Sequence, residues 1–445
     1  MALILFIHAA MLIGGYPFVN VDWFFQLINE YDLRNSFFSS VWYRHGSPPG
    51  YSILFRLFDI LGFGDRYNSL PPVLAMLHAA SFLWLRYAFK NAGIRFSLFI
   101  SAVLLLNPPA FFYFNYPSYS TFIFASSALA LWALFNSGSA DKRFLIIVSC
   151  LAFSCFIRST WHIVFIVFIS VLLAWKFRPT RRSIAWAALI LLLPASAYIK
   201  NYFLFGKFES STWLGFSLCR MHINSGVTDP MAYVEPFTDL EQYYPFINTN
   251  DPLITKYANV SQLNRKDYNN IRCIGLSDSS LHFFLHHFSI RHSLSMLALN
   301  GIPTFFSSPG LYGHLYGHIF YGHNPDDYPT LSFDIFELPD VYFKGRSGAE
   351  FHIKLSWYTI LYPFTLLLYL FYFRRTPFSI RIILLITLFI SLVPVLTDPM
   401  ESNRMRWEVE PFYYFLLFNL VFGRFSPLRK QADRPVKADQ SAYTY

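Results

Sequence analysis

Ten apolar stretches, most of them near the length needed to cross a bilayer, constrain this chain more than any other feature. A helix needs about 20 mostly apolar residues to cross the hydrocarbon of a membrane. Only 14% of the residues are charged and the mean hydropathy is +0.36, whereas soluble domains carry about 25% charged residues. The sequence therefore predicts an all-α polytopic membrane protein with about ten transmembrane helices. The stretches are residues 2–18, 69–87, 96–113, 118–136, 143–157, 159–176, 183–199, 356–373, 380–397 and 408–423.

Basic residues lie in or beside every second connection between these stretches, which predicts the orientation of the chain. Loops rich in Lys and Arg face the cytoplasm, so these connections and both termini are expected there. Three segments, 19–68, 200–355 and 398–407, then share the opposite side. The first two are too long to be simple connectors and are expected to carry the chemistry. The basic residues are Arg86, Lys90, Arg95, Lys142, Arg143, Lys176, Arg178, Arg181, Arg182, Arg374, Arg375, Arg381 and those of the tail.

Four parts follow from this topology. Residues 1–199 form an N-terminal membrane module whose first outer loop, 19–68, carries the predicted catalytic site. Residues 200–355 form a large extracytoplasmic loop, 356–423 the C-terminal transmembrane helices, and 424–445 a polar, basic cytoplasmic tail.

The first outer loop begins with a predicted amphipathic helix headed by Asp22. Apolar residues recur there at helical spacing, which indicates a helix lying half buried in the membrane interface. Asp22 has two compatible interpretations: an N-cap that accepts backbone N–H groups, or a reacting carboxylate. The apolar residues are Trp23, Phe24, Leu27, Ile28 and Tyr31.

A second interfacial helix is predicted to start at Pro48-Pro49, since proline favours the first turn of a helix, and to end at Gly62 and Gly64. Arg44 and His45 precede it and carry donors suited to a phosphate. For Arg44, a surface charge or a lipid headgroup contact is the alternative.

Arg158 lies between two apolar runs. An ionisable residue at membrane depth is costly unless it faces a cavity or a partner, which indicates function; the alternative is a short hairpin from which Arg158 reaches the headgroups. Glu401, Arg404 and Arg406 crowd the short segment 398–407 and form either a substrate lip or a local ion-pair cluster. Glu410 is expected to pair with one of these arginines.

The histidines of the large loop do not predict a metal site. His314 and His318 have a chelating spacing, but no acidic residue is placed to complete a zinc site, and the neighbouring glycines disfavour a regular helix. An aromatic- and histidine-lined docking surface for sugar or headgroup is the favoured interpretation. Cys150, Cys155, Cys219 and Cys273 give no metal or disulfide spacing. The other histidines of these segments are His282, His286, His287, His292 and His323.

The motifs described so far occur in an order that resembles the GT-C superfamily of integral membrane glycosyltransferases. The first is an acidic residue after the first span, followed by Arg44-x-x-x-Pro48-Pro49-Gly50-Tyr51 and an aliphatic-glycine end. The branch of protein O-mannosyltransferases and lipid A aminoarabinose transferases is the most similar. Further similar segments are NPPAFFYFNYPSYSTF (107–122), FIRST (156–160), KNYFLFGKFESST (200–212) and ESNRMRWEVEPF (401–412). Residues 220–355 are not covered.

The resemblance implies an inverting glycosyltransferase that takes a sugar from a polyprenyl-phosphate donor. Asp22 then matches the catalytic base, with Glu30 and Asp32 as the next candidates. Because Trp23 follows Asp22, the acidic pair of the family is absent, so neither a metal nor another cofactor is expected.

The chemistry of such a transfer also defines binding residues. A carboxylate must reach the acceptor nucleophile, and cations must stabilise the departing lipid phosphate; the planar fork of arginine suits a phosphate. The candidates for the donor phosphate are Arg44, Arg158, Lys200, Arg404 and Arg406, and those for substrate contacts are His45, Tyr51, Glu401 and Asn403.

Two other classes remain open: a polysaccharide polymerase or ligase that uses a lipid-diphosphate-linked glycan, and a transporter or non-catalytic membrane scaffold. The expected partners are a polyprenyl-phosphate sugar, a glycan, lipid or protein acceptor, and membrane lipids, with no nucleic acid. A bacterial inner membrane is favoured as the location, or the ER membrane in a eukaryotic host.

Overall fold

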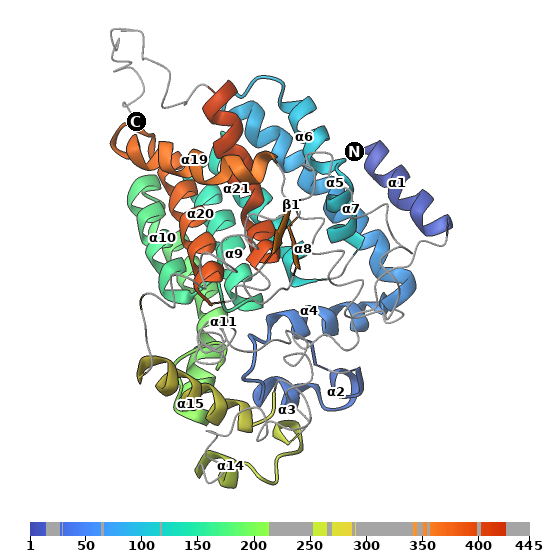
Figure 1. Cartoon of the computed structure of the whole chain (residues 1–445), viewed down its shortest axis with the longest axis vertical. Helices are drawn as coiled ribbons and strands as arrows, with labels where there is room; N and C mark the ends of the chain where they lie inside the picture. The colour runs from blue at the N-terminus through green and yellow to red at the C-terminus, as the bar shows by residue number, and fades with distance from the viewer. Residues whose placement is uncertain are drawn as a thin grey trace.

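Helices dominate the computed structural model, and Figure 1 shows most of them in one bundle with a smaller group of helices at one end. The structure describes residues 1–14, 27–28, 30–63, 66–115, 118–212, 252–264, 269–286, 290, 341–344, 350–353, 357–397 and 402–423. The bundle contains α1 (Ala2–Ile13), α5 (Arg66–Asn91), α6 (Ser97–Leu105), α7 (Pro108–Asn115), α8 (Tyr119–Phe135), α9 (Ala140–Ile157), α10 (Ile163–Phe177), α11 (Arg181–Phe205), α19 (Trp357–Phe371), α20 (Phe378–Thr397) and α21 (Ser402–Phe422).

The smaller group, here called the end layer, comes from the first and second outer segments of the sequence. It contains α2 (Glu30–Asn35), α3 (Phe37–Trp42), α4 (Gly50–Phe58), α14 (Pro252–Lys256) and α15 (Arg272–His286), together with residues 206–212. Short turns are the π-helical Asp59–Phe63 and the 3-10 turns Ser261–Leu263 and Phe373–Arg375. The C-terminal part of α11 joins the bundle to this layer (Figure 1).

Each predicted apolar stretch overlaps a helix of the bundle. Within the described residues, two helical segments are long and apolar enough to cross a membrane, Leu70–Asn91 and Arg181–Phe205. A third span results if the bent pair α6 and α7 counts as one. Ten spans therefore remain a prediction.

Apolar side chains cover the outward faces of α10 and α11. Water does not favour such a continuous apolar surface, whereas lipid tails do. The protein is therefore membrane-associated. The exposed side chains include Val164, Phe168, Val171 and Trp175 on α10, and Leu189, Leu192, Leu193 and Phe203 on α11.

The predicted single helix over 96–113 is wrong, because α6 and α7 meet at a bend of 65°. The sequence there is Asn107-Pro108-Pro109. Proline has no backbone N–H to donate to the carbonyl four residues earlier, so helical bonding stops at this point. The carbonyl of Leu105 accepts a hydrogen bond from His78 Nε2 instead, at 2.9 Å.

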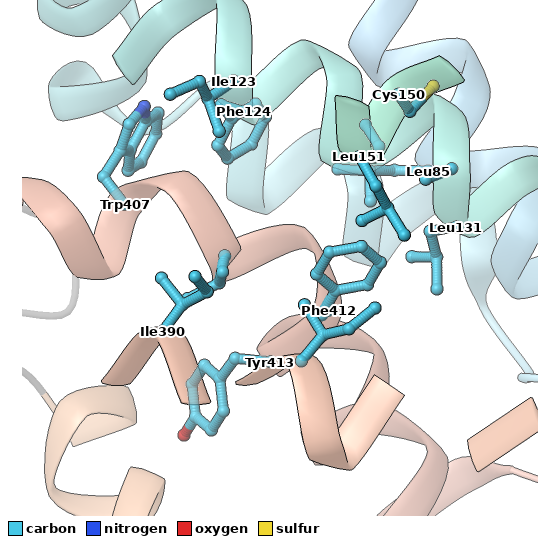
Figure 2. Close-up of a cluster of buried hydrophobic side chains, with 14 of the residues drawn as sticks. Leu85, Ile123, Phe124, Leu131, Cys150, Leu151, Ile390, Trp407, Phe412 and Tyr413 are labelled. Atoms are coloured by element: carbon cyan, nitrogen blue, oxygen red, sulfur yellow. The ribbon is translucent and has the colours of Figure 1, made fainter. Parts of the chain in front are cut away.

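The core of the bundle is centred on α8, which packs against α5, α9 and α21. Figure 2 shows Leu151, Leu131 and Phe412 from three of these helices within one apolar cluster. Trp407 of α21 is stacked between Tyr113 and Phe124, with ring centroids 4.4 and 4.5 Å away.

One β-hairpin departs from the all-α expectation. β1 (Val341–Lys344) pairs antiparallel with β2 (Glu350–Ile353), and Val341 lies opposite Ile353. The hairpin belongs to the segment before α19, which the family resemblance did not cover.

The helix predicted to run from Asp22 is also wrong over its described part. Leu27 and Ile28 are not helical, and α2 begins only at Glu30. Both apolar side chains are buried, and the backbone N–H of Ile28 donates to Ser52 Oγ at 3.2 Å rather than to a helical carbonyl. Asp22 itself lies outside the described residues. The second predicted helix is confirmed, since α4 follows Pro49 as its N-cap.

Candidate functional site

A clasp of three residues, His45, Thr212 and Asn269, fastens the two outer segments to each other. The backbone N–H of His45 donates to Asn269 Oδ1 at 2.7 Å, and His45 Nε2 donates to the backbone carbonyl of Asn269 at 2.9 Å. His45 Nδ1 lies 2.7 Å from Thr212 Oγ1. Because Nε2 carries the proton, Nδ1 accepts from the Thr212 hydroxyl.

Burial keeps this histidine neutral. It lowers the pKa of His45 to about 3, with Lys200 and Arg44 adding to the effect. Both ring nitrogens bind protein groups, so the imidazole of His45, predicted to contact substrate, serves the clasp. The clasp joins two segments that are far apart in the sequence; their placement on one side of the membrane stays a prediction.

Lys200 is a buried cation at the junction of the bundle and the end layer. Its ammonium donates to the carbonyl of Val41, at 3.3 Å, and to that of Arg44. The residue is only 9% exposed. Its described surroundings contain no carboxylate within ion-pair distance. A negative charge brought here would stabilise the charged form of this buried amine.

Arg44 lies beside Lys200, so two of the predicted phosphate-binding residues share one place. The side chain of Arg44 is buried, and its Nε donates to Ser47 Oγ at 2.9 Å. The short turn from Arg44 to Pro49 is held between the clasp and the start of α4.

Arg158 forms a buried ion pair with Glu408, a residue that the sequence analysis missed. Nη1 of Arg158 lies 2.5 Å from Glu408 Oε1, and the two side chains are 4% and 0% exposed. Trp161 Nε1 donates to Glu408 Oε2 at 3.0 Å, and the Ser120 hydroxyl donates to Oε1 at 2.9 Å. Arg158 therefore does not extend to the headgroups.

Tyr51 and Arg158 meet through Tyr119. The guanidinium carbon of Arg158 lies 4.3 Å from the centroid of the Tyr119 ring, and Tyr51 approaches that ring edge-on at 5.9 Å. Gly50 is so close to Phe156 that an added Cβ would lie 2.3 Å from its carbonyl oxygen. The start of α4 thus links the Lys200 region to the Arg158 region.

Arg406 and Glu410 form a second buried pair, as predicted for Glu410. Arg406 Nε donates to Glu410 Oε1 at 3.2 Å, and neither side chain is exposed. Tyr414 donates its hydroxyl proton to the other carboxylate oxygen. The predicted loop over 398–407 is too long, because α21 begins at Ser402 and Arg406 lies on the helix.

Of the remaining predicted site residues, the side chains of three are not described and one, Asp32, is buried. Glu401 lies outside the described residues, as do the side chains of Asn403 and Arg404, whose backbones belong to α21. Asp32 is buried and accepts a hydrogen bond of 2.6 Å from Ser36. Among the described ranges, no three His, Cys, Asp or Glu side chains are grouped to hold a metal ion.

Glu209 adds a titratable carboxyl group to the end layer. Burial raises its pKa to about 7, while Lys207 lowers it and Asp278 raises it further. Lys207 and Asp278 pair at 2.6 Å between the exit of α11 and α15. The layer thus contains a group that titrates near neutral pH.

Comparison with known proteins adds little to this geometry. No family model and no curated protein sequence matches the chain. Among solved structures, the chain is similar to the crystal structure of ArnT from Cupriavidus metallidurans in the apo state, with 10% identity over 94% of this chain and 77% of that chain. The TM-score of 0.27 is too low for this likeness to support a functional assignment.

Proposed function

We propose that the protein is an inverting membrane glycosyltransferase that transfers a sugar from a polyprenyl-phosphate donor to an acceptor on the extracytoplasmic side. The observation that carries the proposal is Lys200, a buried amine that donates to the backbone carbonyls of Val41 and Arg44 where the bundle meets the end layer. A lipid phosphate fits both properties of this place. Its charge compensates the cation, and its hydrocarbon tail extends along the apolar faces of the helices.

Lys200 is the phosphate-binding residue that this geometry favours, and Arg44, whose backbone carbonyl accepts from Lys200, is proposed as a second one from its place in the sequence motif. Arg158 and Arg406 already have carboxylate partners, Glu408 and Glu410. Withdrawing one of those partners from a buried arginine is expensive. The two paired arginines therefore support the helices next to the site, and the lysine at the layer boundary meets the donor.

Asp22 is the proposed base, from its place in the sequence after the first apolar stretch. It takes the proton of the acceptor nucleophile while the acceptor attacks the sugar carbon and the bond to the lipid phosphate breaks. Lys200 and Arg44 stabilise the negative charge that develops on the departing phosphate. Tyr51 is fully buried and meets the Tyr119 ring edge-on, so it fixes the start of α4 next to these groups.

The test uses the purified protein in lipid nanodiscs with polyprenyl-phosphate sugars, and separately with polyprenyl-diphosphate glycans. Asp22→Asn is expected to lower kcat about 10²- to 10⁴-fold, the range of general base catalysis, and to leave donor binding unchanged. Unchanged turnover in this variant rules out Asp22 as the base. Transfer from the diphosphate donor alone supports a polymerase or ligase instead.

A second arm tests the phosphate site. Lys200→Met keeps the length of the side chain but removes the charge, and is expected to weaken donor binding. Lys207→Met is the matched control, because Lys207 lies in the same region but pairs with Asp278. Equal donor affinity in the two variants contradicts the assignment of Lys200.

A further inference from the structure

Two buried histidines from different helices are hydrogen-bonded to each other inside the bundle. Nε2 of His8 lies 2.9 Å from Nδ1 of His78, and Nδ1 of His8 lies 3.2 Å from Asn115 Oδ1. Both histidines are buried. Together with the Leu105 carbonyl, the two histidines form a chain of hydrogen bonds, here called the histidine chain, that joins α1, α5 and α6.

The bend between α6 and α7 explains the far end of this chain. Pro109 stands four residues after Leu105 and has no N–H, so the Leu105 carbonyl has no helical donor. An unpaired carbonyl at membrane depth costs several kcal/mol, and His78 Nε2 supplies the missing donor. The ring of His78 is also stacked on Phe114, with centroids 4.2 Å apart. His78 is thereby fixed in position and in tautomer.

With Nε2 donating, a neutral His78 offers the lone pair of Nδ1 to its other neighbour. His8 Nε2 then donates to it. Through His8, α1 is thus hydrogen-bonded to the ring of His78, and the break between α6 and α7 sets the orientation of that ring.

Within the described residues, α1 packs on the bundle with a narrow face. Its buried side chains are Ile4 and His8, and Leu5, Ile7 and Met11 pack half-buried against the core, whereas Leu3, Phe6 and Ile13 are exposed. Lipid tails solvate apolar side chains as well as a neighbouring helix does, so close packing and interhelical hydrogen bonds determine where a membrane helix sits. On α1, His8 bonds to His78, and the thioether of Met11 accepts a weaker hydrogen bond from Asn115 Nδ2 at 3.4 Å.

We propose that His8 and His78 are positioning residues, which fix α1 against the helix break and thereby set the extracytoplasmic segment that α1 leads into, the segment containing Asp22. The functional half of this inference rests on the proposed function, since it takes Asp22 as the base. The structural half, the anchoring of α1, does not.

A positioning role predicts a separation of kinetic effects. Displacing the base from the acceptor lowers kcat, and a misplacement of about 1 Å can cost on the order of 100-fold. The donor phosphate is held by Lys200 of α11, on a different helix, so KM for the donor stays within about twofold of wild type. A general loss of folding instead lowers the amount of active protein without this separation.

The experiment compares His8→Leu and His8→Gln with wild type in nanodiscs. His282→Leu, which changes an exposed histidine of α15, is the control. Hydrogen–deuterium exchange is followed in residues 2–13 and in α8, and kcat and KM are measured on the same samples. His8→Leu is expected to speed exchange in residues 2–13 but not in α8, and to lower kcat about 10- to 100-fold. In His8→Gln, the amide can still donate to His78 Nδ1. This variant is therefore expected to recover part of the slow exchange in residues 2–13 and part of kcat.

If residues 2–13 exchange at the same rate in His8→Leu as in wild type, His8 does not anchor α1. Faster exchange there with unchanged kcat overturns the positioning role. If Asp22→Asn remains fully active, the proposed base fails, and the exchange measurement still decides whether His8 anchors α1.

Discussion

Two buried arginines in the described part of the protein are each neutralised by one carboxylate. Arg158 has Glu408 and Arg406 has Glu410, and all four side chains are withdrawn from solvent. Removing one member of a buried pair leaves the other charged and desolvated, which destabilises far more than the pair itself stabilises. Substituting one of these carboxylates is therefore expected to lower the free energy of unfolding strongly.

Glu408→Gln is expected to destabilise the protein by about 3–5 kcal/mol, because it leaves Arg158 buried without its counter-charge. The measurement is the apparent Tm in detergent. Lys207→Ala is the control: its pair is 30% and 44% exposed, and such pairs contribute at most about 1 kcal/mol. The expectation fails if the two variants lower the Tm equally. The double variant Arg158→Met with Glu408→Leu should recover most of the loss.

Glu209 gives the end layer a pH-dependent stability. Its pKa is about 7 in the folded protein against an ordinary 4.5, so the folded chain binds the extra proton between these values. Its contribution to stability therefore falls as pH rises from 4.5 to 7, and the full penalty remains above 7. Glu209→Gln is expected to be more stable than wild type at pH 8, with the difference vanishing near pH 4.5.

The difference between variant and wild type isolates this effect from that of His45. The pKa of His45 is lowered to about 3, so its stabilising effect is lost as pH falls below about 6.5, and this is common to both proteins. Apparent Tm values across pH 4.5–8 provide the measurement. A constant difference between the two proteins contradicts the assigned titration.

At this scale, sequence reasoning found the charged groups but only part of their pairing. Glu410 was expected to pair with one of the arginines of segment 398–407 because it stands close to them at the start of the last apolar stretch. Glu408 was missed because its partner, Arg158, is distant in the sequence. The available signal was that a buried arginine requires a carboxylate and that few acids occur near the apolar stretches.

Among the elements, α4 shows how a single small residue positions part of the site. Its first residue, Gly50, lies against the last turn of α9, where a Cβ would meet the carbonyl oxygen of Phe156 at 2.3 Å and its ring at 2.6 Å. Backbone atoms cannot move aside locally. The position of Tyr51 therefore depends on the absence of a side chain at the preceding residue.

Gly50→Ala is expected to displace α4 from α9 and to lower both stability and donor turnover. Gly138→Ala is a matched control, since its nearest described neighbour is Asn136 Nδ2 at 3.7 Å. Apparent Tm and the near-ultraviolet circular dichroism spectrum monitor the packing of the aromatic residues around Tyr51. Wild-type values in Gly50→Ala would show that α4 does not need this close approach.

Element boundaries were predictable where a local rule decides them and not where distant contacts do. Pro48-Pro49 marks the start of α4 by its own chemistry. Leu27 and Ile28 fit the helical periodicity, but their burial and the bond to Ser52 override it. The break at Asn107 was readable from its two prolines; hydropathy alone made the stretch look continuous.

On the scale of the whole molecule, the end layer is built by contacts between two segments that lie far apart in the sequence. His45 and Asn269, separated by 224 residues, are directly bonded. The distribution of basic residues predicts that the two outer segments share one side of the membrane. It does not predict the contacts themselves, because no sequence rule pairs one asparagine with one histidine across several apolar helices.

Topology mapping tests this arrangement in the intact membrane. In a background without the native cysteines, Asn259→Cys is expected to react with an impermeant thiol reagent added from outside, because Asn259 is exposed on the end layer. Arg182→Cys, exposed at the start of α11, should react only after permeabilisation. Labelling of both from the same side contradicts the orientation.

The long separation between His45 and Asn269 has a consequence for biosynthesis. At about 5–20 residues per second, a ribosome needs on the order of 10–45 s to reach residue 269 after residue 45 has been made. During that interval the turn around His45 has already been made but lacks the side-chain amide and backbone carbonyl of Asn269 that will complete it. Assembly of the end layer is therefore a late event, and a nascent chain arrested after α11 should expose the turn around His45 to proteases that the finished protein resists.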